Sequence, residues 1–262
     1  MRILMIRRAE QFSPHSVEKD RAILEAVATR LTQRGHIVTL IDECSVESFL
    51  STNTPDFVFS MARLPETLHL LESSGIKVVN TPSSVEHSTR HRLQEMMISL
   101  DIPIPTGDGQ HGYWLKRGDA AGQTAQDVVY VPDELALSEA KAAMRARGID
   151  DFIVSPHVQG DLVKFYGVLS SGFFRYFYPT DDGQTKFNQE RLNGKAHHYP
   201  FDIGKLQKKA EKLATTAGLE IYGGDCIVRA DGSWYMIDFN DWPSFSRCRE
   251  EAADAIAGLI KK

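Results

Sequence analysis

Short apolar runs alternate with amphipathic stretches over the first third of the chain. Residues 2–7 read Arg-Ile-Leu-Met-Ile-Arg, an apolar run that predicts a buried strand. Residues 16–34 instead repeat their apolar side chains at helical spacing, and Gly35 follows as a helix stop. Three further strands are expected at 36–41, 57–60 and 77–79. Alternation of strands and helices predicts an α/β domain with a parallel sheet over residues 1–83.

The remainder of the chain divides into two further regions, 84–155 and 156–262. In the first of these regions the pattern predicts helices over 85–100 and 132–147 and strands over 113–116, 127–131 and 151–154. In the second it predicts strands over 162–169 and 173–178, a helix over 202–217, a β-hairpin and a final helix over 246–260.

The hairpin, residues 222–245, is the most informative stretch. Two β-rich runs flank Asp231-Gly232, a dipeptide typical of tight hairpin turns. If the turn consists of these two residues alone, Asp225 lies opposite Asp238, and Asn240 lies on the same face. The opposite face is almost wholly apolar and is expected to pack on a core, through Cys226, Val228, Tyr235, Ile237 and Phe239.

Directly opposed carboxylates repel each other, so the pair Asp225 and Asp238 favours a cation between them. Two carboxylates and an amide are hard oxygen ligands that suit Mg²⁺. The alternative is a surface hairpin whose acids are solvated.

The hairpin also resembles the metal-binding end of the ATP-grasp superfamily, in which a Gly-Asp pair precedes an acid-x-Asn pair and then a proline. Here the pattern is Gly224-Asp225, Asp238-Phe239-Asn240 and Pro243. The resemblance covers nearly the whole chain in the same order, including the steps Asn80-Thr81-Pro82 and Asp101-Ile-Pro-Ile-Pro-Thr106. It implies an ATP-grasp fold preceded by the parallel-sheet domain, with ATP and Mg²⁺ as cofactors and Mn²⁺ as an alternative ion. The metal ligands would be Asp225, Asp238 and Asn240.

The same resemblance assigns residues to ATP. Arg90 occupies the basic position of an Asp-Lys pair, and Lys116 ends a strand before a loop with Gly118 and Gly122 that would cover the phosphates. A point charge beside backbone N–H groups suits that role. Four further residues are implied by position, the first three at the hinge that reads adenine and the fourth at the ribose: Ser155, His157, Val158 and Asp161. Lys164 would face the phosphates.

Carboxylate–amine ligases of this superfamily, including those like glutathione synthetase, carry an arginine between hinge and metal hairpin. The corresponding stretch here supplies Lys186 and Arg191 as catalytic cations, with Asn193 beside them. Arg247, past the Pro243 turn, would reach the same substrate. Ligands of open α/β sheets bind beyond the carboxyl ends of the strands, which adds Arg8 and Arg63 as substrate-binding candidates.

An ATP-dependent ligase acting through an acyl-phosphate is therefore the expected function. A kinase acting on a polyol, as in the inositol trisphosphate kinases that share the phosphate-covering loop, is the first alternative. A nucleotide-binding regulator without turnover is the second.

Composition narrows the partners. The 262 residues carry a formal net charge of −5, which disfavours a general nucleic-acid binder. The resemblance implies a small molecule or a short peptide as substrate. Three cysteines without metal-type spacing favour a reduced, cytoplasmic setting. No apolar run reaches the roughly 20 residues of a membrane span, and no signal segment is expected. The sequence leaves the oligomeric state open, a homodimer included.

Overall fold

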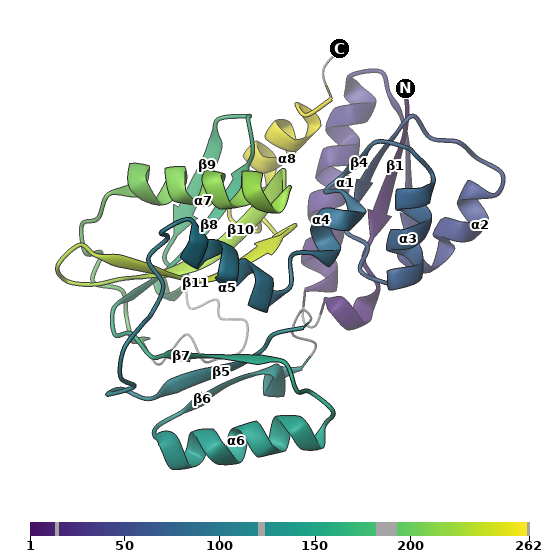
Figure 1. Cartoon of the computed structure of the whole chain (residues 1–262). Helices are drawn as coiled ribbons and strands as arrows, with labels where there is room; N and C mark the ends of the chain where they lie inside the picture. Colours follow the sequence, from purple (N-terminus) through teal and green to yellow (C-terminus); the bar gives the residue numbers. More distant parts are fainter. Residues whose placement is uncertain (14–15, 120–123, 182–192, 261–262) are drawn as a thin grey trace.

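The computed structural model describes residues 1–13, 16–119, 124–181 and 193–260, which form three sheets (Figure 1). The strand orders are β2-β1-β3-β4, β6-β5-β7 and β11-β10-β8-β9. The first sheet is wholly parallel, as the alternating pattern predicts, whereas the other two are antiparallel. No helix in the described ranges has the length and apolar character that a membrane crossing requires.

The N-terminal domain is a parallel sheet with helices on its faces. Its strands are β1 (Arg2–Arg7), β2 (Ile37–Asp42), β3 (Phe57–Ser60) and β4 (Val78–Val79). Its helices are η1 (Glu10–Phe12), α1 (Val17–Gln33), η2 (Glu43–Ser45), α2 (Val46–Leu50), α3 (Pro65–Ser73) and α4 (Pro82–Glu86). The strands lie within one residue of their predicted positions, because each is a short apolar run bounded by polar residues.

The segment 85–100, predicted as one helix, is broken in the structure. It contains the end of α4 and then α5 (Arg90–Ser99), and Thr89 begins the second helix because its hydroxyl accepts a hydrogen bond from the Arg92 N–H. The break therefore comes from a local capping side chain.

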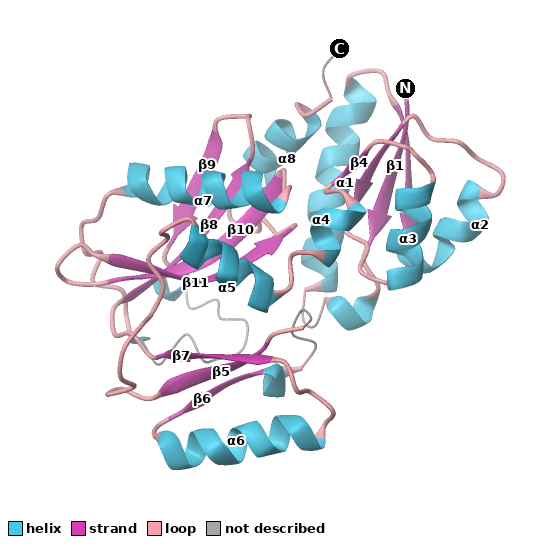
Figure 2. Ribbon diagram, viewed as in Figure 1, coloured by secondary structure: helices cyan, strands magenta, loops and turns pink. Residues whose placement is uncertain are grey.

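The central lobe follows α5 and has its own small core. It consists of β5 (Tyr113–Arg117), η3 (Ala125–Asp127), β6 (Val128–Val131), α6 (Glu134–Ala146) and β7 (Phe152–Pro156). Helix α6 covers one face of this sheet (Figure 2). The core between helix and sheet contains Leu115, Val131, Leu137, Met144 and Ile149.

The C-terminal lobe carries the long hairpin. Its elements are β8 (Asp161–Val168), β9 (Phe173–Phe177), η4 (Pro179–Asp181), α7 (Ile203–Ala217), β10 (Ile221–Val228), β11 (Trp234–Asp241) and α8 (Arg249–Ala257). Helices α5 and α7 pack on one face of its sheet through one hydrophobic cluster. The other face has two parts: apolar side chains that meet α8 and α1, and polar side chains that are exposed to a cavity.

The hairpin differs from its predicted form in two ways that cancel. Its tip holds three residues, 230–232, because the Arg229 N–H donates to the Ser233 carbonyl and Gly232 adopts a φ of +78°. A β-bulge between Asp225 and Cys226 then shifts the register by one residue. As a result Asp225 still pairs with Asp238, as predicted.

Between the bulge and the turn, the predicted apolar face is wrong at two positions. Met236 and Trp234 are in the core instead of Ile237 and Tyr235, and Ile237 is displaced to the cavity wall. A one-residue shift exchanges the two faces of a strand, and the bulge restricts that exchange to the tip of the hairpin. The prediction holds for Cys226, Val228 and Phe239, which are buried.

The N-terminal domain and the C-terminal lobe share one core. Helix α8 lies along α1 (Figure 1), and a single cluster of buried residues runs from β1 and α1 into β8, β10 and α8. Asn80 adds a polar link: its amide donates to the Ile221 carbonyl at 2.8 Å and accepts from the Ile221 N–H at 2.9 Å. These contacts fix the N-terminal domain against the sheet that carries the hairpin.

Candidate active site

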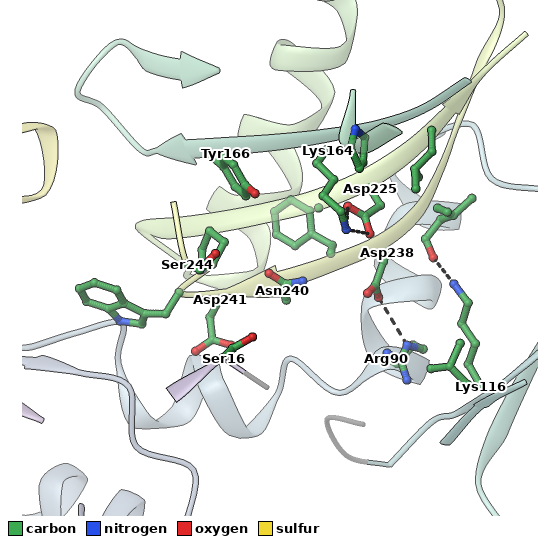
Figure 3. A pocket seen from close by; sticks show the side chains of 18 of the residues that line it. Ser16, Arg90, Lys116, Lys164, Tyr166, Asp225, Asp238, Asn240, Asp241 and Ser244 are labelled. Carbon is green, nitrogen blue, oxygen red and sulfur yellow. Dashed lines mark hydrogen bonds and ion pairs between the residues drawn. The ribbon is translucent and has the colours of Figure 1, made fainter. Parts of the chain in front are cut away.

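Three side chains form one rung across the middle of the C-terminal sheet. Lys164 on β8 pairs with Asp225 on β10, which pairs with Asp238 on β11. Side chains that share a rung lie on the same face of a sheet. The Lys164 ammonium and the carboxylates of Asp225 and Asp238 therefore project from the same face. Asn240 follows two residues after Asp238 and lies beside them (Figure 3).

Each carboxylate of the rung already has a cationic partner. The Lys164 ammonium lies 3.1 Å and 3.2 Å from the two oxygens of Asp225. The Arg90 guanidinium at the start of α5 approaches Asp238 with an Nε–Oδ1 distance of 3.4 Å, and it donates to the Arg117 carbonyl at 2.7 Å. Arg90 thereby connects the hairpin to the central lobe.

Lys116 reaches the same place from the central lobe. It is only 7% exposed, and its ammonium donates to the Ile237 carbonyl at 2.7 Å. Burial lowers the pKa of Lys116, and the negative charge of Asp238 acts against this shift. Lys116 and Arg90 therefore surround the Asp238 end of the rung.

The two carboxyl groups differ in their protonation tendency. Burial raises the pKa of Asp225, although Lys164 beside it opposes the shift. Burial also acts to raise the pKa of Asp238, but the charges of Arg90, Lys116 and Lys164 outweigh it and lower the pKa. Asp238 therefore has the stronger tendency of the two carboxyl groups to be ionised.

All of these groups line a single cavity of about 380 Å³. Thirteen of the sequence-predicted site residues line it: Arg8, Arg63, Arg90, Lys116, Ser155, His157, Val158, Lys164, Asn193, Asp225, Asp238, Asn240 and Arg247. They come from the central and C-terminal sheets, from α5 and from loops that include those after β1 and β3, so the fold brings together residues that lie more than 200 positions apart.

The central-lobe end of the cavity is aromatic. His157 is buried against Trp114 and Tyr130, and the Trp114 indole N–H donates to His157 Nδ1 at 3.0 Å. Burial lowers the pKa of His157, with a smaller contribution from His111. The imidazole is thus neutral at neutral pH, with its proton on Nε2. Ser155 and Val158 border the same end.

Asp161 does not fit its predicted role at the ribose. It is 1% exposed and absent from the cavity wall, and its two oxygens accept from the backbone N–H groups of His197 and Tyr199 at 2.8 Å and 2.9 Å. The Asp161 carboxylate therefore fastens a loop to β8. The sequence did not reveal this, because its partners lie more than thirty residues away.

Gly118 also lies outside the cavity wall. Its N–H donates to the Asp151 carbonyl at 2.9 Å and its carbonyl accepts from the His91 N–H at 3.2 Å. Gly118 thus ties the end of β5 to its neighbours. Gly122, Lys186 and Arg191 lie outside the described residues, so their proposed roles stay predictions.

At the opposite end the cavity reaches the N-terminal domain. Arg8 lies 3.1 Å from Asp20 and donates to the Trp242 carbonyl at 2.8 Å. Arg63 forms an ion pair with Asp241, which is 3% exposed. Two arginines therefore line this end of the cavity, and carboxylates of the chain partly balance their charges.

Arg247 enters the same end of the cavity from the segment before α8. It donates to the carbonyls of Tyr178 and Pro179 at 2.9 Å and 3.2 Å. Asn193 lies on the cavity wall as well.

Sequence reasoning missed Trp114 and Tyr166, both of which line the cavity. Trp114 precedes the predicted cation Lys116 on β5 by two residues. Tyr166 follows the predicted cation Lys164 on β8 by two residues. The period of two in a strand places such residues on one face, and this signal would have identified both.

The described part of the chain contains no group of three or more His, Cys, Asp or Glu residues that could hold a metal ion. The hairpin offers two carboxylates and an amide, a set that suits Mg²⁺ because this ion uses one or two carboxylates and completes its shell with water and phosphate oxygens. The low pKa tendency of Asp238 agrees with this use, since a ligating carboxylate must be ionised.

No family model and no curated protein matches the sequence. Solved structures do match, over nearly the whole of this chain. D-alanyl-alanine synthetase A from Vibrio cholerae is similar with a TM-score of 0.70 and 13% identity, over 98% of this chain and 94% of that one. A RimK domain protein ATP-grasp from Sphaerobacter thermophilus gives 0.63 and 19% over 99% of both chains. Macrocyclase MdnC from Microcystis aeruginosa, bound with precursor peptide MdnA, gives 0.66 and 13% over 100% of both.

These similarities cover nearly the whole of this chain, and therefore all three of its sheets. At such low identity the comparison establishes the architecture. The chain has the ATP-grasp fold, with a parallel-sheet domain in front of it.

Proposed function

We propose that this chain is an ATP- and Mg²⁺-dependent ligase that joins a carboxylate to an amine through an acyl-phosphate. The observation that carries the proposal is the rung of Lys164, Asp225 and Asp238, with Arg90 and Lys116 converging on it in one cavity. Phosphoryl transfer requires mainly positioning and charge neutralisation, and this group supplies both.

The solved neighbours support the nucleotide. One D-alanine–D-alanine ligase, from Bacillus anthracis, was crystallised with ATP, and an N5-carboxyaminoimidazole ribonucleotide synthetase with ADP. In this chain Arg90, Lys116 and Lys164 would hold phosphate oxygens, and Asp225, Asp238 and Asn240 would hold Mg²⁺. The metal ion supplies charge neutralisation at the phosphates. Ser155, His157 and Val158, beside Trp114, would receive the base.

Two transfers complete the proposed reaction. A carboxylate oxygen of the acceptor bonds to the γ-phosphorus while the bond to the bridging oxygen breaks, and ADP leaves with that electron pair. An amine nitrogen then bonds to the carbonyl carbon, phosphate leaves with the electrons of its C–O bond, and the amine loses a proton. The acyl-phosphate and the tetrahedral species that the amine forms from it both carry negative charge on the acceptor side, which nearby cations stabilise.

The distribution of charge favours a carboxylate over a polyphosphorylated alcohol as acceptor. Of the arginines at the acceptor end, Arg8 and Arg63 already have carboxylate partners, Asp20 and Asp241. An acceptor with several phosphates would require more positive charge than these pairs leave available. The peptide bound to MdnC makes a peptide carboxylate one candidate acceptor.

Hydroxylamine tests this proposal because it intercepts an acyl-phosphate as a stable hydroxamate. Purified protein, ATP and Mg²⁺ are incubated with a panel of amino acids, short peptides and polyols, and ADP and hydroxamate are both measured. We expect ADP and hydroxamate to rise together with one carboxylate. A phosphorylated alcohol without hydroxamate would establish a kinase instead, and ATP binding without any turnover would establish a regulator.

A further inference from the structure

Next to the Lys164–Asp225–Asp238 rung lies a second rung, of which the proposed function uses only Asn240. Tyr166 on β8 pairs with Gly223 on β10, which pairs with Asn240 on β11. Tyr166 follows Lys164 by two residues and therefore lies on the same face of the sheet. Figure 3 shows Tyr166, Ser244 and Asn240 around the same part of the cavity.

The middle position of this rung has no side chain, and a turn occupies the space. A Cβ atom on Gly223 would come within 2.8 Å of the Pro243 ring, so glycine lets Pro243 lie directly on the sheet. The turn continues through Ser244 to Ser246, and both serines line the cavity. Arg247 follows and also lines it.

Tyr166 is held rigidly within this arrangement. Its ring lies 5.4 Å from the ring of Phe245 and 5.9 Å from that of Phe177, centroid to centroid, and the residue is 8% exposed. The hydroxyl nevertheless has no hydrogen-bond partner among the described residues, although Tyr166 lines the cavity. A buried tyrosine usually pairs its hydroxyl, so a packed hydroxyl that has no partner in the described part of the chain is suited to a ligand.

The chemistry of the hydroxyl determines what it can bind. Burial raises the pKa of Tyr166 to about 12, which keeps the phenol protonated at every ordinary working pH. The Tyr166 hydroxyl is thus a neutral hydrogen-bond donor near the Lys164 ammonium. A donor in such surroundings pairs best with an anionic oxygen.

The location determines which ligand that is. Lys116, Ser155 and His157 lie at the central-lobe end of the cavity and would be taken by the nucleotide. Tyr166 lies on the other side of the phosphate-binding rung, toward Arg247 and the N-terminal domain. An acceptor must lie on this side to reach the terminal phosphate in line.

We propose that Tyr166, together with Ser244, Ser246 and Arg247, forms the subsite for the acceptor carboxylate, and that its hydroxyl donates to the carboxylate oxygen that is not phosphorylated. This inference rests on the proposed function, since it assumes that the acceptor is a carboxylate. The hydrogen bond orients the other oxygen toward the phosphate. It adds nothing to ATP binding.

The first test observes the hydroxyl directly. The protein is labelled with 3-fluorotyrosine, which gives one fluorine resonance for each of its 8 tyrosines. The resonance lost in Tyr166→Phe identifies Tyr166, and the exposed Tyr176 on β9, which does not line the cavity, serves as the internal control. The probes are acetate, succinate and L-glutamate, added in the presence of Mg²⁺ and a non-hydrolysable ATP analogue. We expect the Tyr166 resonance to shift saturably with at least one of them and the Tyr176 resonance to stay in place.

The second test measures the consequence. Tyr166→Phe retains the ring packing and removes only the hydroxyl, so hydroxamate formation at limiting carboxylate should fall roughly tenfold to a hundredfold while ATP affinity stays unchanged. Tyr176→Phe should match the wild type in both. A Tyr166 resonance unmoved by all of the carboxylates while nucleotide still binds would overturn the inference, as would an unchanged hydroxamate rate in Tyr166→Phe. Failure of Mg²⁺ and nucleotide to bind would instead contradict the proposed function.

Discussion

Each cation at the Lys164–Asp225–Asp238 rung contacts an oxygen atom of the protein itself. Lys164 binds the carboxylate of Asp225, Arg90 lies against Asp238, and Lys116 binds the carbonyl of Ile237. These contacts neutralise a group of charges that would otherwise be unpaired within a partly buried site. A phosphate group offers the cations a stronger partner than a neutral carbonyl, which applies above all to Lys116.

Lys116→Met is therefore expected to weaken ATP binding in the presence of Mg²⁺. The substitution retains an apolar stem in a buried position and removes the ammonium, and hydrogen bonds to charged groups contribute about 1.5–3 kcal/mol. The dissociation constant measured by calorimetry should rise roughly tenfold to a hundredfold. Lys212→Met, at an exposed position of α7, serves as the matched control and should bind like the wild type. An unaltered dissociation constant for Lys116→Met would remove Lys116 from the nucleotide site.

Single residues were predictable wherever one strand supplied the pattern. The opposition of Asp225 and Asp238 followed from the hairpin sequence. Lys116 was assigned from its place at the end of a strand before a glycine-containing loop, and Lys164 was assigned through the resemblance to ATP-grasp proteins. Asp161 was not predictable, because its burial depends on a loop that returns from residues 197 and 199 to bond with it. Tyr166 was overlooked because the aromatic character of β8 resembles that of any core strand.

Among the elements, helix α5 connects the C-terminal sheet to the central lobe. Its first residue, Arg90, contacts Asp238, and its second, His91, binds Asp151 with a distance of 2.8 Å between Nδ1 and Oδ1. The hydrogen bond to Asp151 raises the pKa of His91. This pair gives the connection a dependence on pH.

The sign of that dependence follows from the raised pKa. The His91–Asp151 pair contributes its full stability below the unfolded-state pKa of about 6.5, and the contribution is lost as the pH rises through the higher folded-state pKa. Because both side chains are substantially exposed, the contribution should stay below about 1 kcal/mol. Titration of His91 by NMR should give a pKa above about 6.5 in the wild type and a lower value in Asp151→Asn. Asp150→Asn, at the exposed neighbouring position, should leave the value unaltered, and an identical pKa in all three proteins would refute the pairing.

At the scale of elements, type and position were largely predictable and connections were less so. All strands of the N-terminal sheet were found within one residue of their predicted positions, since their apolar runs are short and sharply bounded. The hairpin turn was assigned two residues instead of three, and only the bulge next to Asp225 preserved the predicted opposition. Turn length and bulges depend on local backbone geometry that the Asp231-Gly232 dipeptide alone does not specify.

The whole molecule contains one extended core and one separate small core. The N-terminal sheet and the C-terminal lobe are joined by a continuous cluster at α1 and α8, whereas the central lobe has its own. The sequence predicted three regions and could not show this grouping, because the apolar stripe of a helix does not reveal which distant helix it meets. The region boundaries at 83 and 155 stay predictions.

Two substitutions that shorten a buried side chain should show that these cores unfold independently. Leu137→Ala opens the small core beneath α6, and Ile256→Ala opens the shared core beneath α8; cavities of this kind cost about 2–5 kcal/mol. Followed by hydrogen exchange, Leu137→Ala should accelerate exchange in β5–β7 alone. Ile256→Ala should accelerate it in both α1 and β8–β10. Equal acceleration throughout the chain in both variants would show that the lobes unfold as one unit.

The central claim is that the opposed carboxylates of the hairpin bind the metal ion that accompanies a nucleotide. It is tested most directly by the affinity for a non-hydrolysable ATP analogue, measured by calorimetry with and without Mg²⁺ in the wild type, Asp238→Asn and Asp231→Asn. Asp231 lies at the exposed tip of the same hairpin and provides the matched control. We predict that Mg²⁺ tightens binding by at least about tenfold in the wild type and in Asp231→Asn, and that Asp238→Asn loses this gain. An undiminished Mg²⁺ effect in Asp238→Asn would contradict the account.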